Sequence, residues 1–384
     1  MSGSLLIEAS ATGNQDLVVD LLSKGADVLV QDESGQTALM HAVLANDFTV
    51  SRFLLEAGSD PNHKNANGLS PFIAAGANGF SELLDLMLSY GADVTIVNRF
   101  GGTALLPSSE KGYLKTVQIC LEQGVPVNHM NRLGWSALHE AVILGDGGYL
   151  YTLIAKLLLE AGADADVKDR SGLSPADYAK ILSQSQIEQL FESDVLRDSS
   201  ETSQFLSFFK EGKYEEGLAH VERAFANEEK GELYFWEGLF LQELKQFDRA
   251  IVAFTKGITS EVGSEQFYFY VANCFRMIKR QEEALEILNQ AIAVSAAPTF
   301  YLYHKSNYLR EFDRHSEAIA AIEQLLESSP ERTDYLFHQA NSLTTIGAYE
   351  KAAKAMELAT SLDPGNELFV EHRSQSLEKV TAHS

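Results

Sequence analysis

Short apolar segments with helical spacing alternate with polar, glycine-containing turns along the first half of the chain. Two series of glycines share one constant step: Gly35, Gly68, Gly101 and Gly134, and Gly25, Gly58, Gly91 and Gly124. Two residues after each glycine of the first series stands Thr or Ser, and the same holds for Gly172, which follows a five-residue insertion. A constant step of about 33 residues predicts a solenoid of stacked units.

The second half has a slightly longer period, of about 34 residues. Alanines recur at this step, and a small residue precedes each of them by twelve positions: Ala250, Ala284, Ala318 and Ala352, preceded by Gly238, Ala272, Ser306 and Ala340. Small residues at these sites allow two helices of a hairpin to approach at the usual 8 to 10 Å between axes. The sequence therefore predicts a second helical solenoid. Solenoid units bury their apolar faces against their neighbours, so the architecture favours an extended binding surface over a closed catalytic pocket.

Both halves resemble known repeat families. Residues 134–141 (GWSALHEA) and 154–164 (IAKLLLEAGAD) resemble the two helices and the glycine stop of an ankyrin repeat. Residues 333–366, with Ala340 and Pro364 among their matching positions, resemble a tetratricopeptide repeat. The resemblance implies an all-α fold of tandem α-solenoids, with ankyrin repeats followed by tetratricopeptide helical hairpins.

We expect an ankyrin domain over residues 1–192 with about six repeats, caps included. A polar segment at residues 193–203 reads as a linker. Residues 204–384 would form about five hairpins and a C-terminal capping helix. Because solenoid contacts are between neighbours, each half is expected to fold alone.

Charge and composition limit the classes of partner that we expect. The net charge is −24, shared as −12 by each half, and no basic stripe stands out, so nucleic acid and anionic lipid are not expected partners. No apolar run approaches the ~20 residues that cross a bilayer, and the N-terminus does not read as a secretory signal. The presence of only two cysteines favours a reducing compartment, so we expect a cytoplasmic protein. We further expect a monomer whose partners are other proteins.

The sequence gives little indication of a catalytic or metal-binding site. His63 and His129 lie at equivalent positions two repeats apart, roughly 20 Å from each other in a stack with ~10 Å spacing, which is too far for one metal. Asp164, Asp166 and Asp169 lack the spacing of a calcium loop. No catalytic motif is present, so we expect no cofactor, no metal and no enzymatic activity. The ankyrin resemblance gives His41 and His139 the role of tying adjacent loops.

The turns between repeats, here called fingers, carry the first candidate binding surface, because ankyrin partners usually lie along them. The candidates are arginines two residues before finger glycines and two neighbouring aromatic residues: Arg99, Arg132, Arg170, Phe100 and Trp135. Trp135 stands next to its glycine, where it is either an exposed hot spot or folded back over its own loop. The insertion at residues 145–149 is expected to lengthen the loop between two helices, either to touch a partner or as a tolerated insertion.

The second candidate surface lies on the first helix of each hairpin, where positions 2, 5, 9 and 12 share a face. In the resembled family that face lines a concave groove. The candidates are position-9 asparagines, position-5 aromatics and position-12 arginines: Asn273, Asn307, Asn341, Phe269, Tyr303, Phe337, Arg276 and Arg310. The asparagines would either bond the backbone of an extended peptide or tie adjacent helices, and some of the aromatics would belong to the core between repeats.

These features favour a non-catalytic adaptor whose tetratricopeptide groove binds an extended peptide and whose ankyrin fingers bind a second protein. The alternative is a regulator or inhibitor that covers a single enzyme with one continuous surface.

Overall fold

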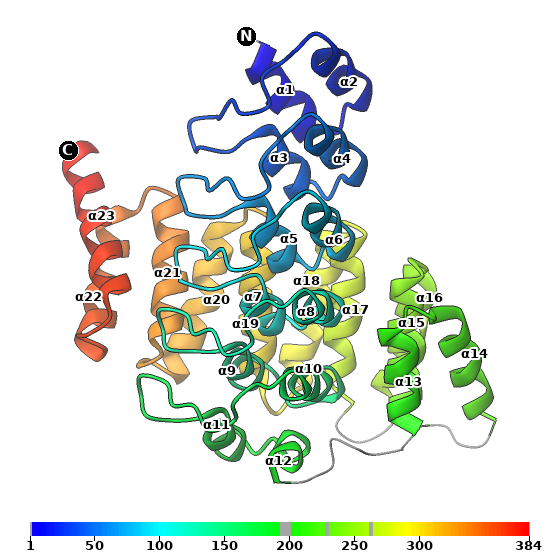
Figure 1. Cartoon of the computed structure of the whole chain (residues 1–384). Helices are drawn as coiled ribbons and strands as arrows, with labels where there is room; N and C mark the ends of the chain where they lie inside the picture. Colours follow the sequence, from blue (N-terminus) through cyan, green and yellow to red (C-terminus); the bar gives the residue numbers. More distant parts are fainter. Residues whose placement is uncertain (1, 193–200, 227–229, 261–263, 384) are drawn as a thin grey trace. The chain divides into compact units, whose positions relative to one another are not determined.

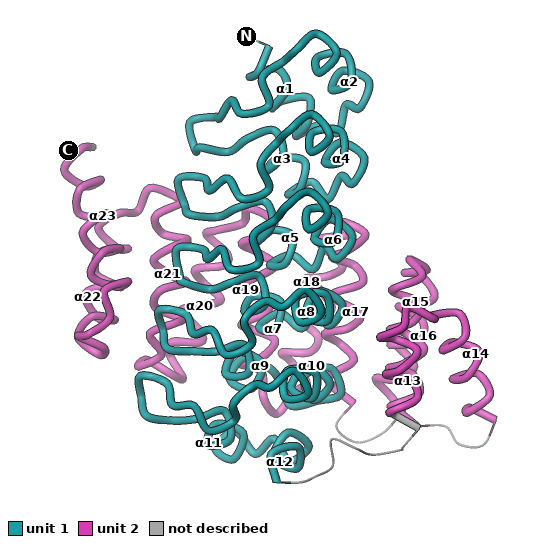
Figure 2. Tube along the Cα trace, in the orientation of Figure 1, with its two compact units in different colours: residues 1–193 teal, residues 194–384 magenta. Residues whose placement is uncertain are grey.

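The structure is a computed structural model that describes residues 2–192, 201–226, 230–260 and 264–383. Its regular elements in these ranges are helices, as expected for an all-α fold. The chain divides into two compact units, residues Met1–Ser193 and Asp194–Ser384, coloured separately in Figure 2. Most of the expected linker lies outside the described residues, but its last part is helical, since α13 begins at Glu201.

The helices described in unit 1 form six pairs, which Figure 1 shows as a stack. The helices are α1 (Ser2–Ala11), α2 (Gln15–Ser23), α3 (Ala38–Leu44), α4 (Phe48–Glu56), α5 (Pro71–Asn78), α6 (Ser81–Ser89), α7 (Leu105–Glu110), α8 (Leu114–Glu122), α9 (Ala137–Leu144), α10 (Tyr149–Glu160), α11 (Pro175–Ile181) and α12 (Ser185–Glu192). First helices of successive pairs pack against each other, and so do second helices, which gives two layers. The fingers extend to one side of the stack, as Figure 1 shows.

Helix starts in unit 1 follow from the hydroxyl residue two places after each finger glycine. Thr37, Ser70, Ser136 and Ser174 each accept the N–H of the third residue of the helix that follows, which satisfies a donor that the helix itself leaves unpaired. In the repeat with Leu106 and Pro107, α7 begins later, at Leu105, and is only six residues long. The proline sits in the first turn, where its missing N–H costs no helical hydrogen bond.

The expected lengthening of the loop accounts for only part of the five-residue insertion. The loop between α9 and α10 is residues 145–148, and α10 has 12 residues where α8 has nine. The extra turn brings Tyr151 into the core, and its hydroxyl donates to the carbonyl of Glu110 at 2.9 Å. A Cβ atom on Gly145 would lie 2.4 Å from the Tyr151 ring, so a glycine is needed for this packing.

Unit 2 is a chain of antiparallel helical hairpins in which each helix packs on the next. Its helices are α13 (Glu201–Lys210), α14 (Tyr214–Ala224), α15 (Gly231–Glu243), α16 (Phe247–Ile258), α17 (Gln266–Met277), α18 (Gln281–Val294), α19 (Pro298–Glu311), α20 (His315–Ser328), α21 (Thr333–Thr345), α22 (Tyr349–Leu362) and α23 (Glu367–His383). The small residues act as expected: a Cβ on Gly238 would lie 2.2 Å from the ring of Phe254, so the two helices of that hairpin approach too closely for a larger side chain.

Candidate protein-binding surfaces

Each finger is closed by a side chain that the sequence pattern contains but that was not among the candidates. Three residues before each finger glycine stands Asn or Asp, namely Asp32, Asn65, Asn98, Asn131 and Asp169. In all five fingers the Oδ1 atom accepts the N–H groups of the second and fourth residues after it, at 2.8 to 3.0 Å. This bonding fixes the finger conformation locally, because the turn supplies its own acceptor. The signal in the sequence is the recurrence of Asn or Asp once per repeat.

Hydrogen bonds also join successive fingers. The N–H of Arg132 donates to the carbonyl of Phe100 at 2.7 Å. His63 and His129, the pair considered for a metal, instead place Nε2 3.1 Å and 2.5 Å from the carbonyl oxygens of Gly35 and Gly101 in the preceding fingers. The fingers therefore form a connected surface rather than separate flexible loops.

The three candidate arginines lie against the preceding finger. A Cβ on Gly134 would be 2.8 Å from Cγ of Arg170, and one on Gly101 would be 3.0 Å from Cγ of Arg132. Arg99 similarly approaches Gly68, and its guanidinium lies 5.1 Å from the centre of the Phe100 ring, within cation–π range. Glycine is thus required by this close contact as well as by the positive φ of the turn, which is 77° at Gly101. The result is a row of arginines at equivalent places on successive fingers.

Trp135 is half-buried and contacts the next finger instead of folding over its own loop. Its indole N–H donates to Oδ2 of Asp169 at 3.2 Å, and the Tyr178 hydroxyl donates to the same oxygen at 2.7 Å. Asp169 is buried, and its carboxylate accepts hydrogen bonds from Trp135, from Tyr178 and from the backbone of its own finger.

The two helix-opening histidines differ. His139 donates from Nε2 to the carbonyl of Leu173 in the next finger at 3.4 Å, while its Nδ1 accepts the N–H of Ser136. His41 places Nε2 2.8 Å from Oδ2 of Asp32 in its own finger. Only the His139 contact joins adjacent loops as expected; the His41 contact lies within one loop.

In unit 2, the candidate asparagine of α17 is bonded internally. Oδ1 of Asn273 accepts from Nε of Arg276 at 3.1 Å and lies 3.5 Å from the Tyr308 hydroxyl of α19. Arg276 also pairs with Glu311 at 2.9 Å and lies over the Tyr308 ring. The arginine side chain is 1% exposed, so it is not placed to receive a peptide carboxylate from solvent. Burial raises the pKa of the Tyr308 hydroxyl above its ordinary value.

The other two asparagines repeat the arrangement with different partners. Oδ1 of Asn307 accepts from Arg310, whose Nη1 lies 2.6 Å from Nδ1 of His338 on α21. Oδ1 of Asn341 lies 3.1 Å from Nε2 of His372 on α23. In all three cases the amide oxygen takes part in a contact that leads to the next hairpin or helix. These contacts favour the interpretation in which the asparagines tie adjacent helices.

The position-5 aromatics are part of the core. Phe269, Tyr303 and Phe337 are 1 to 2% exposed. Each packs on aromatic rings two helices further along the chain; the ring centroid of Phe269 lies 4.6 Å from that of His304 on α19, and the ring centroid of Phe337 lies 5.3 Å from that of His372 on α23. Their side chains are therefore not exposed walls of a peptide groove.

No group of three or more His, Cys, Asp or Glu residues in the described part of the chain could hold a metal ion. Both cysteines are buried with free thiols, and burial raises the pKa of Cys120 to about 12. Among the described helices, none has the length and apolar character needed to span a membrane.

The family model of ankyrin repeats (3 copies) matches residues 5–98 and 72–169, and that of the tetratricopeptide repeat matches residues 303–367. Both kinds of repeat are protein–protein interaction modules. The recognition of two repeat families from the sequence is thereby confirmed.

Individual relatives match the first half. The chain is 35% identical over 183 residues to the ankyrin repeat protein YahD of Escherichia coli K12. The aligned region makes up 47% of this chain and 91% of that protein. An ankyrin repeat-containing protein of Treponema pallidum is 37% identical over 82 residues, or 21% of this chain and 26% of that one. A crystal structure of an ankyrin repeat domain from Acinetobacter baumannii is 42% identical with a TM-score of 0.47, covering 48% of this chain and 94% of that one.

Proposed function

Because the chain belongs to the ankyrin-repeat proteins and continues into tetratricopeptide repeats, we propose that it is a non-catalytic adaptor that holds one protein on its fingers and a second on unit 2. The buried thiols suit a reducing compartment, and we propose the cytoplasm as its location.

The row of finger residues is the observation that carries the proposal for unit 1. Arg99, Arg132 and Arg170 recur on three successive fingers, with Phe100 and Trp135 beside them. Arginine and aromatic side chains contribute most to protein interfaces, and here their positions are fixed by finger-to-finger contacts before any partner binds. In a chain of net charge −24, a row of positive charge favours a partner with an acidic face.

We also propose a second protein partner for unit 2. The asparagine ladder, which is the set Asn273, Asn307 and Asn341, gives this proposal little support. The amide oxygens are engaged within the unit, the position-5 aromatics are buried, and Arg276 is paired with Glu311. A peptide that bound there would have to replace these contacts.

The test is affinity purification from the native cell with the full chain and with the double variant Arg99→Glu/Arg132→Glu. A matched control is Lys24→Glu/Arg52→Glu, since both residues are exposed and form i,i+4 pairs away from the fingers. We expect one set of captured proteins to be lost with the finger variant and kept with the control, while a second set survives both. If every captured protein is equally sensitive to both variants, the finger surface is not the binding site.

Using each half as bait separates the adaptor from the alternative function. Different proteins captured by residues 1–192 and 201–384 support an adaptor. A single protein that requires both halves supports a regulator that covers one partner with a continuous surface.

A further inference from the structure

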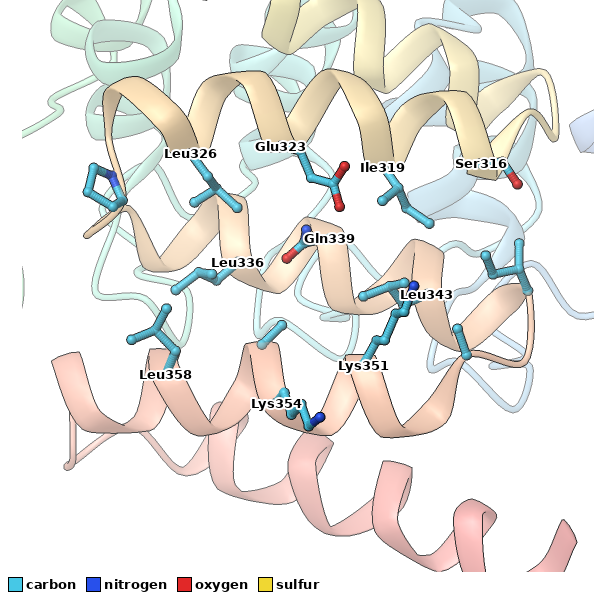
Figure 3. Close-up of a pocket in the computed structure, with 14 residues that line it drawn as sticks. Ser316, Ile319, Glu323, Leu326, Leu336, Gln339, Leu343, Lys351, Lys354 and Leu358 are labelled. Atoms are coloured by element: carbon cyan, nitrogen blue, oxygen red, sulfur yellow. The ribbon is translucent and has the colours of Figure 1, made fainter. Parts of the chain in front are cut away.

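A groove of about 640 Å³ lies along α21, between α20 and α22 (Figure 3). Helix α21 packs against both neighbours and forms the floor, and α20 and α22 form the two walls. All the lining residues belong to unit 2. The groove is thus a feature of this hairpin array alone.

The floor and walls of the groove are largely apolar. Along α21 and its end the lining positions are Leu336, Gln339, Leu343 and Ile346, spaced by 3, 4 and 3 residues, so they share one face. Two large apolar side chains remain accessible, with Ile346 47% and Leu358 45% exposed. Exposed apolar surface within a concave site is typical of a binding groove.

The groove is on the opposite side of α21 from the asparagine ladder. Phe337 and Asn341 lie about 140 to 180° around the helix from the centre of the groove face, given ~100° per residue. A partner in the groove would therefore leave the internal contacts of Asn341 and Phe337 intact. The inference below rests on the proposed second partner of unit 2 and gives it a site, but it does not depend on the asparagine ladder or on the finger surface.

The polar lining residues are arranged by charge. Lys351 and Lys354 of α22 are exposed on one wall, Glu323 of α20 is on the other, and Gln339 lies at the middle of the floor. Within the described residues, none of these four side chains has a hydrogen bond or ion pair. Their donors and acceptors face the groove or solvent.

The lysine pair is a local departure from the repeat. At the 34-residue step the equivalent pairs in the three preceding hairpins are Glu317 and Ala320, Glu283 and Glu286, and Arg249 and Val252. Among these four hairpins, two basic residues stand on this wall in the last one alone, in a chain whose net charge is −24. A positive edge beside an apolar floor fits a ligand that is apolar on one side and acidic at its flank.

We propose that this groove binds an amphipathic α-helix of a partner protein, with apolar residues facing α21 and acidic residues facing Lys351 and Lys354. The floor runs from Leu336 to Ile346, about 15 Å at ~1.5 Å per residue, which matches three turns of a bound helix. A helix satisfies its own backbone hydrogen bonds, whereas an extended segment would leave most of them unmet on these helical walls.

The probes for the test are two fluorescent, helix-forming synthetic peptides with leucines at positions i, i+3, i+4 and i+7. One carries Glu and the other Lys along one flank, and binding to the full chain is measured by anisotropy. We expect the Glu peptide to bind more tightly. Lys351→Glu/Lys354→Glu should weaken it about tenfold or more, because two attractive charges become repulsive, and should improve binding of the Lys peptide.

The control variants separate this groove from general surface effects. Ile346→Ser should weaken both peptides, while Val252→Ser on α16, which removes a side chain that is 55% exposed, should change neither. Lys256→Glu controls for charge. The substituted residues are exposed, so melting curves should confirm that each variant is folded.

Equal affinity for the two peptides, or equal effects of groove and control variants, would overturn the proposal. Sedimentation of the full chain tests a second copy as the occupant: a dimer that Ile346→Ser dissociates would also overturn it. The finger variant Arg99→Glu/Arg132→Glu should leave peptide binding unchanged, so failure here is distinct from failure of the finger surface.

Discussion

Arg276 of α17 and Glu311 of α19 form an ion pair of 2.9 Å that joins two hairpins, and the Arg276 side chain is almost completely buried. The same guanidinium donates to Asn273 and lies over Tyr308, so one cation connects several parts of the interface between repeats.

Removal of this cation should strongly destabilise unit 2. Arg276→Ala leaves the Glu311 carboxylate without its partner and removes one of the donors to Asn273, so the free energy of unfolding should fall by ~3 kcal/mol or more. Arg280→Ala is the control, because its pair with Glu283 is exposed and worth ~0 to 1 kcal/mol. Denaturant unfolding of the full chain measures both, and similar losses in the two variants would contradict the role given to Arg276.

The asparagine ladder gives a second prediction. Since the Oδ1 atoms of Asn273, Asn307 and Asn341 accept or share internal hydrogen bonds, each Asn→Ala variant should lose ~1 to 3 kcal/mol of stability. Thermal melts without any ligand are sufficient. If two or three of the variants melt like the parent chain, the asparagines are available to an extended peptide, and the hypothesis of a peptide groove on that face regains support.

The last finger gives a third. Asp169→Ala removes an acceptor used by Trp135, Tyr178 and two backbone N–H groups, so it should cost unit 1 ~2 kcal/mol or more. Trp135→Phe keeps a ring but deletes the single N–H donor, and should cost ~1 kcal/mol. Chemical denaturation of both variants tests this order. A larger loss from Trp135→Phe would mean that ring packing, not the Asp169 contact, dominates.

Acid should weaken unit 1 through His139. Burial lowers the pKa of this imidazole below its ordinary value, against the opposing effects of the Leu173 carbonyl and the Asp169 carboxylate. The unfolded chain then binds a proton at a higher pH than the folded chain, so this contribution is complete above the unfolded pKa of about 6.5 and is lost as the pH falls through the lower, folded value.

The measurement is the melting temperature of unit 1 between about pH 7.5 and pH 5.5 for the parent and for His139→Asn. The decrease should be smaller in the variant. An identical pH slope in both proteins would show that His139 does not contribute to it.

The domain assignment leads to a fifth prediction. Fragments 1–192 and 201–384 should each unfold cooperatively, because the packed helix pairs of each unit are neighbours within it. Circular dichroism melts decide this. A fragment without a cooperative transition would place the boundary elsewhere.

Periodicity predicted the fold well because the repeats depend on local features. The recurring glycines of the first half indicate the conformation of each turn. The recurring small residues of the second half indicate where two helices approach closely. Each repeat specifies these features within its own sequence. The Asn or Asp three residues before each finger glycine recurs just as regularly, but its role as the acceptor that closes the turn depends on backbone geometry that spacing alone does not give.

The sequence predicted which residues share a helix face more readily than which of them are buried. The spacing of Phe269, Asn273 and Arg276 places them on one side of α17, but their exposure depends on His304 and Tyr308 of the next hairpin. The insertion at residues 145–149 was expected to lengthen a loop, and its three glycines do lie in the loop between α9 and α10. The spacing alone did not show that the insertion also extends α10, which begins at Tyr149 and buries Tyr151.

The nested fingers restrict where this protein can change length. Each finger closes its own turn through an Asn or Asp side chain, and an arginine of one finger rests on the glycine of the finger before it, as Arg132 does on Gly101. Extra residues within a finger would disturb both relationships, whereas extra residues on the helical side disturb neither. The additional residues of the fifth repeat lie in the loop between α9 and α10 and in α10 itself, on the helical side, so the finger turns and the contacts between them keep their geometry.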